Sequence, residues 1–121
     1  KEKMKIYRTY RAHCARYIPT LDDGHICKEM HGHTFNIVVS IDGPINEKTG
    51  FVIDFFDLDK IVKKEVISII DHKVLNDIDG LSNPSTEHLA IFVWNKLVSQ
   101  IDHLSKIAIS EDEGTGTEYS G

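Results

Sequence analysis

The sequence predicts an α+β domain, with a four-stranded antiparallel sheet and two helices on one face of that sheet, in the order ββααββ. Three observations support this. β-rich segments open the chain, two segments with helical spacing of apolar residues follow, and further β-rich segments lie at residues 104–111 and 116–120. The length of 121 residues suits one domain, spanning 1–121, in which we expect residues 1–4 to be a loose N-terminal end.

Two segments in the first third of the chain have the composition of strands. Residues 5–13 combine apolar and aromatic residues, and residues 34–41 have the sequence Thr-Phe-Asn-Ile-Val-Val-Ser-Ile. Between them, residues 14–30 form a long loop, and loops of such length are usually functional. After the second strand we expect turns over residues 43–50 and a short extended piece over 51–55.

Two amphipathic helices follow these strands. Each places its apolar residues on one helical face. Asp57 is the expected N-cap of the first helix, which runs to about Ile70. Ser85 or Thr86 is the expected N-cap of the second, which runs to Ile101. We therefore expect both helices to pack on the same side of the sheet.

Composition excludes several classes of function. The net charge of −5 and the lack of a basic cluster argue against nucleic acid as a direct partner. No apolar run approaches the ~20 residues of a membrane span, and no signal-peptide pattern opens the chain, so we expect no membrane partner. Cys14 and Cys27 are too few for a disulfide scaffold, which favours free thiols and the reducing cytoplasm.

The segment His31-Gly32-His33 is the strongest functional signal. Two histidines two positions apart on an extended segment project from the same face, and Gly32 has no side chain to crowd a ligand. Such a pair also occurs by chance without a metal. A third histidine, His13, on a neighbouring strand and the nearby Cys27 favour a site. We expect Zn²⁺ at His13, His31 and His33, with a fourth position open for water or substrate.

Further motifs occur in a fixed order along the chain. They are His13, Cys27-x3-His31-Gly32-His33, Gly50-Phe51-Val52-Ile53-Asp54-Phe55, Leu58, Asp71-His72, Leu75-Asn76, Asn83-Pro84-Ser85-Thr86-Glu87 and Glu111. In order and approximate spacing they resemble the 6-pyruvoyl-tetrahydropterin synthase family over essentially the whole chain. The Cys-x3-His-Gly-His spacing is most similar to its bacterial 6-carboxy-5,6,7,8-tetrahydropterin synthase branch, which acts in queuosine biosynthesis.

The resemblance implies a fold and an assembly. The family has the tunnelling fold, or T-fold, whose strand and helix order is the one predicted above. Its members form closed rings with active sites between subunits, so we expect a homohexamer. Exposed sheet edges favour an oligomer independently, because an unpaired edge strand is prone to associate.

The resemblance also implies chemical roles. Zinc would act as a Lewis acid beside the side-chain oxygens of the substrate. Cys27 would be the base, which requires a nearby cation or metal to favour thiolate; alternatively, it is a fourth, structural zinc ligand. Asp71 and His72 would form an acid–base pair, provided that the turn ending the helix or a subunit boundary lets them meet; alternatively, they are a polar helix end. Strand alternation, apart from the resemblance, turns Cys14 to the face opposite its neighbour His13, so we expect Cys14 to be a packing residue.

Substrate contacts follow in the same way. Glu111 would accept the amino and ring N–H groups of a pterin with both carboxylate oxygens. Ser85 and Thr86 lie where the family supplies further pterin contacts, although as helix caps they would need no ligand. Triphosphate requires cations, for which the candidates by position are Arg16, Lys28 and Lys73.

The resulting hypothesis is a zinc-dependent lyase. It would convert 7,8-dihydroneopterin triphosphate to 6-carboxy-5,6,7,8-tetrahydropterin and release acetaldehyde and triphosphate. Two alternatives stay open: a 6-pyruvoyl-tetrahydropterin synthase, and an inactive pterin-binding zinc protein of the same fold. Departures from the family pattern at Glu29, Asp112 and Ser120 keep the second alternative open.

Overall fold

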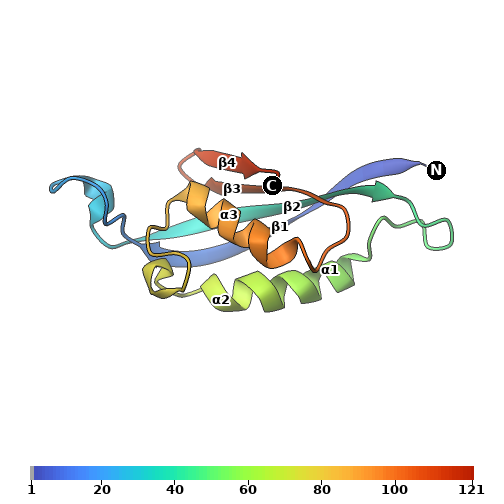
Figure 1. Ribbon diagram of the computed structural model, residues 1–121, viewed down its shortest axis with the longest axis horizontal. Helices are drawn as coiled ribbons and strands as arrows, with labels where there is room; N and C mark the ends of the chain where they lie inside the picture. The colour runs from blue at the N-terminus through green and yellow to red at the C-terminus, as the bar shows by residue number, and fades with distance from the viewer. Residues whose placement is uncertain (1) are drawn as a thin grey trace.

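The computed structural model describes residues 2–121 as one four-stranded antiparallel sheet with helices packed on one side (Figure 1). The strands, in their order across the sheet, are β1 (Lys3–Arg16), β2 (His31–Pro44), β3 (Leu104–Glu111) and β4 (Gly116–Tyr119). Between β2 and β3 lie α1 (Phe55–Val62), the π-helical turn η2 (Lys63–Ile67), α2 (Ser68–Ile70), the 3-10 turn η3 (Leu75–Asp77) and α3 (Thr86–Leu97). The predicted α+β class and its ββααββ order are confirmed.

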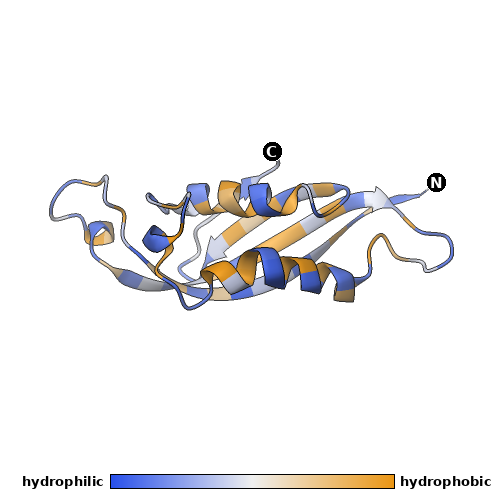
Figure 2. Cartoon of the chain, turned by 60° about the horizontal axis from the view of Figure 1, so that its bottom comes forward, coloured by the Kyte–Doolittle hydropathy of each residue, from blue (hydrophilic) through white to orange (hydrophobic). Residues whose placement is uncertain are grey.

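The face of the sheet covered by the helices forms the core (Figure 2). Its buried strand residues are Tyr10, Ala12, Cys14, Phe35, Ile37, Val39, Ile41, Ile107 and Ile109. The helices contribute Leu58, Val62, Val66, Ile70, Leu89, Ala90, Val93 and Leu97. Side chains alternate between the two faces along a strand, so the intervening strand residues lie on the opposite face. This alternation also decides which face each candidate site residue occupies.

Both early strands extend beyond their predicted ranges of 5–13 and 34–41. Their ladder is continuous and ends with Arg16 directly opposite His31. Residues 14–16 were expected to belong to a loop, because Cys-Ala-Arg carries little strand propensity of its own. Backbone pairing with the long partner strand outweighs that weak preference. As a result, both histidines of the His-Gly-His segment lie within β2.

The connections change accordingly. Lys3 and Met4 pair with β2, so the expected loose end is wrong for these two residues; residue 1 lies outside the described residues. The turn expected from residue 43 begins only after Pro44, which ends β2. The extended piece expected at 51–55 is not a strand but a bend that leads into α1. The connection between β1 and β2 contains the 3-10 turn η1 (Ile26–Lys28) and projects from one end of the sheet (Figure 1).

The first helix begins earlier than predicted. Asp54, not Asp57, is its N-cap, since the Asp54 carboxylate accepts a hydrogen bond from the backbone N–H of Phe56 at 2.8 Å. Asp57 lies in the first turn, where its negative charge still favours the helix N-terminus. The helical segment continues through η2 and ends at Ile70, as predicted.

The second helix, α3, begins as predicted and ends early. The Ser85 hydroxyl accepts a hydrogen bond from the backbone N–H of His88 at 3.1 Å, so Ser85 is the N-cap. The helix ends at Leu97, before the predicted end at Ile101. Neither α3 nor any other helix within residues 2–121 is long and apolar enough to cross a membrane.

Replacing the observed cap should destabilise the protein measurably. Asp54→Ala removes the acceptor for the Phe56 N–H and should lower the free energy of unfolding by about 1 kcal/mol. Asp57→Ala is the matched control, because it removes one first-turn charge and no cap, and it should cost about 0.5 kcal/mol or less. Urea unfolding followed by circular dichroism measures both. Equal losses in the two variants would contradict the assignment of the cap to Asp54.

Candidate active site

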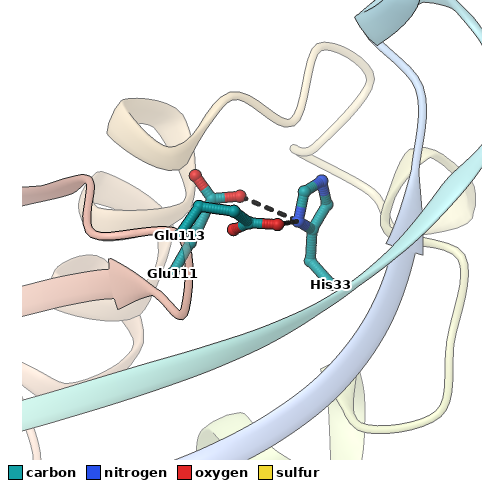
Figure 3. Close-up of side chains that lie close together, drawn as sticks. All are labelled: His33, Glu111 and Glu113. Atoms are coloured by element: carbon teal, nitrogen blue, oxygen red, sulfur yellow. Dashed lines mark ion pairs between the residues drawn. The ribbon is translucent and has the colours of Figure 1, made fainter.

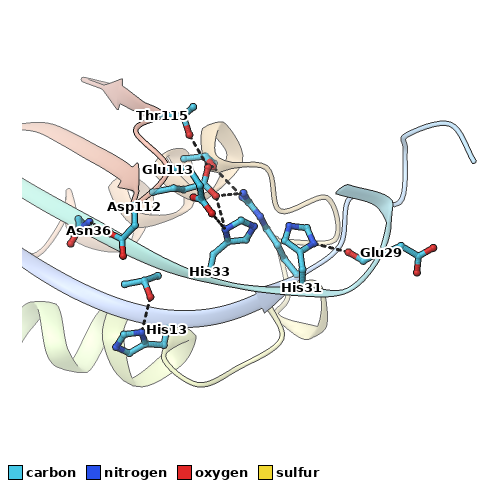
Figure 4. Close-up of polar contacts among 12 residues, drawn as sticks. His13, Glu29, His31, His33, Asn36, Asp112, Glu113 and Thr115 are labelled. Atoms are coloured by element: carbon cyan, nitrogen blue, oxygen red, sulfur yellow. Dashed lines mark hydrogen bonds and ion pairs between the residues drawn. The ribbon is translucent and has the colours of Figure 1, made fainter. Parts of the chain in front are cut away.

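The three histidines predicted to bind zinc lie on opposite faces of the sheet. The β1–β2 register pairs His31 with Arg16, and alternation places His31 and His33 on the face that the helices cover. His13 pairs instead with Thr34 on the other face, where its Nδ1 lies 3.0 Å from the Thr34 Oγ1. Figure 4 shows His31 and His33 on one side of the strands and His13 on the other. The structure therefore does not bring the three predicted ligands together.

Arg16, rather than a histidine, lies opposite His31 on the covered face. Its Nη2 forms an ion pair with the Glu111 Oε1 at 2.7 Å. Its Nη1 donates to the Pro84 carbonyl and to the Thr86 hydroxyl, both at 3.1 Å. Only 9% of the Arg16 side chain and 11% of the Glu111 side chain are exposed. The ion pair is therefore buried and joins the ends of β1 and β3 to the start of α3.

Glu111 is the centre of this polar group, which we call the Arg16 cluster (Arg16, His33, Thr86, Glu111 and Thr115). The His33 Nδ1 lies 3.0 Å from the same Glu111 Oε1 that Arg16 contacts. The hydroxyls of Thr115 and Thr86 lie 3.1 and 3.4 Å from Oε2. Both carboxylate oxygens thus have partners within the protein. A pterin gripped by Glu111 would have to replace the two threonine hydroxyls at Oε2.

The neutral form of His33 is favoured in this cluster. Burial, followed by the nearby Arg16 charge, lowers the pKa of His33, and Glu111 opposes this only in part. The carboxylate beside Nδ1 favours the tautomer with its proton on that atom, which leaves Nε2 as an acceptor. The His33 Nε2 and the Arg16 Nε are both buried without a hydrogen-bond partner in the described structure. The cluster thus retains one unpaired acceptor and one unpaired donor, which is unusual in a folded protein.

The residues present do not fit the predicted three-histidine zinc site. Within residues 2–121, one set of three candidate ligands, His33, Glu111 and Glu113, has its ligand atoms within 4.8 Å of one another (Figure 3). A zinc ion on Glu111 would lie about 2 Å from a carboxylate oxygen. Arg16 donates to that carboxylate at 2.7 Å, so a second positive charge would lie within roughly 5 Å. The set of His33, Glu111 and Glu113 could hold a metal ion by distance alone, but the Arg16 guanidinium already supplies the positive charge that the metal would bring.

Asp71 and His72 contact each other, as their predicted role requires. The helix ends at Ile70, and His72 adopts a left-handed conformation with φ of 60°. This turn brings the His72 Nδ1 to 3.0 Å from the Asp71 Oδ2. The backbone N–H of His13 donates to the Asp71 Oδ1 at 2.9 Å, and the His72 N–H donates to the His13 carbonyl at 2.6 Å. Strand β1 therefore holds the pair in place.

The electrostatics of the pair suit proton transfer. The hydrogen bond from the His13 N–H lowers the pKa of Asp71, the His72 ring adds to this effect, and burial opposes it. An ionised Asp71 beside Nδ1 keeps the proton of a neutral His72 on that nitrogen, so Nε2 is free to accept another. The His72 side chain is 76% exposed and accessible to a ligand.

A pocket of about 500 Å³ lies beside the pair. It is lined by His13, Cys14, Ala15, Gly32, His33, Thr34, His72, Lys73 and Val74. Residues of both faces therefore border it, at the end of the sheet where β1 and β2 carry small residues. Of the three predicted phosphate-binding cations, Lys73 lines the pocket, Arg16 is paired with Glu111, and Lys28 is paired with Asp23 at 2.6 Å.

The two cysteines differ in setting. Cys14 is buried and donates a hydrogen bond through Sγ to the Ile70 carbonyl at 3.3 Å, and burial raises its pKa to about 12. It is the packing residue that alternation predicted. Cys27 lies in η1, in the projecting connection, and does not line the pocket. No set of three close ligand atoms in residues 2–121 includes it. Within one subunit, Cys27 is therefore not placed as a base beside the pocket or as a fourth metal ligand.

The three departures from the family pattern lie at the margins of the site. Glu29 contributes its backbone carbonyl, which lies 2.7 Å from the His31 Nδ1. Asp112 accepts from the Asn36 side-chain amide at 3.1 Å (Figure 4), and Ser120 follows β4. The residue that the sequence prediction underrated is Arg16. Extending the first strand by three residues would have placed it on the face of His31, because both positions then pair directly.

Comparisons with known proteins agree with this architecture. A family model described as 6-pyruvoyl tetrahydropterin synthase matches residues 5–121. A 6-pyruvoyl tetrahydropterin synthase structure from Caenorhabditis elegans superposes with a TM-score of 0.90 at 24% identity, covering 99% of this chain and 96% of that one. This likeness confirms the predicted T-fold.

Curated relatives carry three different names. A 6-pyruvoyl tetrahydrobiopterin synthase of Dictyostelium discoideum is 35% identical over 99 residues, covering 78% of this chain and 73% of the relative. An Archaeoglobus fulgidus protein provisionally named 6-carboxy-5,6,7,8-tetrahydropterin synthase is 33% identical over 92 residues, or 76% of each chain. A dihydroneopterin monophosphate aldolase of Pyrococcus furiosus is 33% identical over 110 residues, covering 84% and 92%. Relatives of similar identity therefore bear the names of different pterin reactions.

Breaking the buried ion pair should be far more damaging than breaking a surface pair. Arg16→Met leaves the Glu111 carboxylate buried without its cation and should lower the free energy of unfolding by roughly 3–5 kcal/mol. The control is Arg11→Met, which removes the 3.6 Å pair with Asp112, whose side chains are 56% and 58% exposed. Its cost should stay below about 1 kcal/mol. Denaturant unfolding compares the two, and similar losses would show that the Arg16 pair is not buried in solution.

The lowered pKa of Asp71 predicts a pH dependence. An ionised Asp71 stabilises the fold above the ordinary aspartate pKa, and this contribution is lost as the pH falls through the lowered value. The stability difference between the parent and Asp71→Asn should therefore be largest near pH 7 and shrink below about pH 4. Thermal unfolding over this range measures it. Asp23→Asn, at a side chain that is 97% exposed, is the control, and a pH-independent difference for Asp71→Asn would refute the assignment.

Proposed function

The chain belongs to the 6-pyruvoyl tetrahydropterin synthase family, and from that membership we propose that it is a lyase acting on the side chain of a reduced pterin. The observation that carries the proposal is the Asp71–His72 pair, with its 3.0 Å contact, beside a pocket of about 500 Å³. A carboxylate, an imidazole with a free nitrogen and an adjacent pocket are the components that general acid–base catalysis needs.

The proposed substrate is 7,8-dihydroneopterin triphosphate. With one water consumed, the products would be 6-carboxy-5,6,7,8-tetrahydropterin, acetaldehyde and triphosphate, a reaction of queuosine biosynthesis. Support comes from the Cys27-x3-His31-Gly32-His33 spacing and from the archaeal relative provisionally given that name. The second candidate is the 6-pyruvoyl product, which the name of the Dictyostelium relative favours.

Residues of the pocket and of the Arg16 cluster have proposed tasks. His72 would take a proton from the substrate side chain at Nε2 and return it later, while Asp71 stabilises the imidazolium that forms in between. Lys73 lines the same pocket and would offset the negative charge of the phosphates. Glu111 would bind the pterin amino group through Oε2, in place of the hydroxyls of Thr86 and Thr115. Ser85 would act as the helix cap only.

The proposal includes no step through zinc. The predicted ligands His13, His31 and His33 do not share a face, and the remaining set around Glu111 lies beside a guanidinium. An inactive pterin-binding protein of the same fold is the alternative of a different class. The free Nε2 of His72 favours an enzyme, because a purely structural helix end has no need for an exposed and oriented imidazole.

We propose that the complete site forms between subunits of a homohexamer. In the four-stranded sheet, β4 leaves one edge unpaired, and the outer edge of β1 is paired with residues 72–74 only at its end, near His13 and Ala15. The remaining open length of β1 favours association. Met4 and Tyr7 on β1 are 53% and 67% exposed, which adds apolar surface along that strand. A neighbouring subunit would also supply what one subunit lacks, a thiol such as Cys27 beside the pocket. Both cysteines are free thiols, which suits the reducing cytoplasm where we place the protein.

Turnover of the proposed substrate is the direct test. Incubation with 7,8-dihydroneopterin triphosphate should release acetaldehyde, measured with a coupled dehydrogenase. His72→Asn should lower kcat by about 100-fold or more, because it removes the proton acceptor while asparagine tolerates the left-handed backbone.

The control is His103→Asn, since His103 has the same backbone conformation, with φ of 65°, and does not line the pocket. Its turnover should equal that of the parent. Formation of the 6-pyruvoyl product without acetaldehyde would move the assignment to the second candidate. Pterin binding without any turnover would favour the inactive alternative.

A further inference from the structure

One position on β1 could complete a three-histidine set with His31 and His33. On β1 the residues that share the covered face with His31 and His33 are Ala12, Cys14 and Arg16, and none of them is a histidine. Arg16 lies directly opposite His31, where cross-strand partners have Cβ atoms about 4.5–5.5 Å apart. Cys14 lies directly opposite His33, but its Sγ donates to the Ile70 carbonyl in the core. Position 16, opposite His31, is therefore the remaining place on β1 for a third ligand beside the two histidines.

The guanidinium at that position is held by several partners at once. Nη2 contacts Glu111, while Nη1 donates to the Pro84 carbonyl and the Thr86 hydroxyl. Its Cζ also lies 5.0 Å from the centre of the Phe35 ring. Rotation of Arg16 away from the site would break all of these contacts and leave the Glu111 carboxylate buried without a cation. The arginine is thus a fixed part of the site, not a mobile surface charge.

We propose that Arg16 is the resident cation of this site and takes the place of a metal ion, so that the chain holds no zinc with His31 and His33. The guanidinium balances the Glu111 carboxylate, which removes the charge that a divalent ion would neutralise. Two atoms remain unpaired, the donor Arg16 Nε and the acceptor His33 Nε2. A metal ion could bind the His33 Nε2 but cannot satisfy the Arg16 N–H donor, whereas a hydroxyl group or a water can satisfy both atoms. The site is therefore built for a neutral hydrogen-bonding group.

A single substitution tests this inference through metal content alone, so its outcome does not depend on the proposed enzymatic function. The parent protein, incubated with zinc sulfate and dialysed, should retain less than about 0.1 zinc per chain by mass spectrometry. Arg16→His places a third imidazole on the face of His31 and His33 and should retain about one zinc per chain. Added zinc should also raise the melting temperature of Arg16→His and leave that of the parent unchanged.

Two controls separate the gain of a ligand from the loss of the guanidinium. Arg16→Gln removes the charge without adding a ligand and should stay free of zinc. Arg16→His combined with His33→Ala should lose the zinc again. A folded Arg16→His protein that takes up no more zinc than Arg16→Gln would overturn the geometry on which the inference rests.

The parent protein alone also decides the matter if the variants fail to fold. Calorimetric titration of the parent with zinc should show no binding tighter than about 10 µM. Binding near one zinc per chain with a submicromolar dissociation constant, abolished by His31→Ala or by Glu113→Ala, would show that a metal ion and not Arg16 is the resident cation. Either result is independent of turnover.

Discussion

The buried ion pair between Arg16 and Glu111 is the interaction on which this end of the molecule depends. Its 2.7 Å contact connects the last residue of β1 to the last residue of β3, across β2, and the same guanidinium holds the chain just before α3. A buried charge without its partner is costly, so neither side chain can be altered alone without disturbing three strands and a helix start. The same guanidinium donates to the Thr86 hydroxyl and, after burial, is the next cause of the lowered pKa of His33.

The Arg16 cluster and the Asp71–His72 pair differ in how far they are enclosed by the protein. On the covered face, the Arg16 cluster is enclosed, charge-balanced and nearly complete in its hydrogen bonds. At the outer edge of β1, Asp71 and the exposed His72 form a pair anchored to the backbone of His13. Enclosure suits recognition, because all but two of the polar atoms have fixed partners and the two unpaired atoms can bind a ligand. Exposure suits proton exchange with a ligand. The pocket at the end of β1 and β2 borders both, which is why we place the substrate there.

Much of the fold followed from the sequence, because apolar periodicity and capping residues are local signals. The order of elements, the Ser85 cap, the end of the helix at Ile70 and the packing role of Cys14 depend on such signals. Strand ends do not, since pairing with a partner strand extends them beyond their own propensity. Misjudging the end of β1 concealed the fact that Arg16, not His13, shares a face with His31. The Asp54 cap was missed because Asp57 offered the same chemistry one turn later.

The π-helical turn η2 sets the direction, around the helix axis, in which the chain leaves the helix after Ile70. Leu58, Val62, Val66 and Ile70 are buried at intervals of four residues. In an ideal α-helix each such interval overshoots a full turn by ~40°, or ~120° over the three intervals. The wider π turn absorbs part of that drift and keeps these residues on one face. Asp71 therefore leaves the helix facing β1, and regularising η2 by deleting one residue would turn the acid–base pair away from the strand.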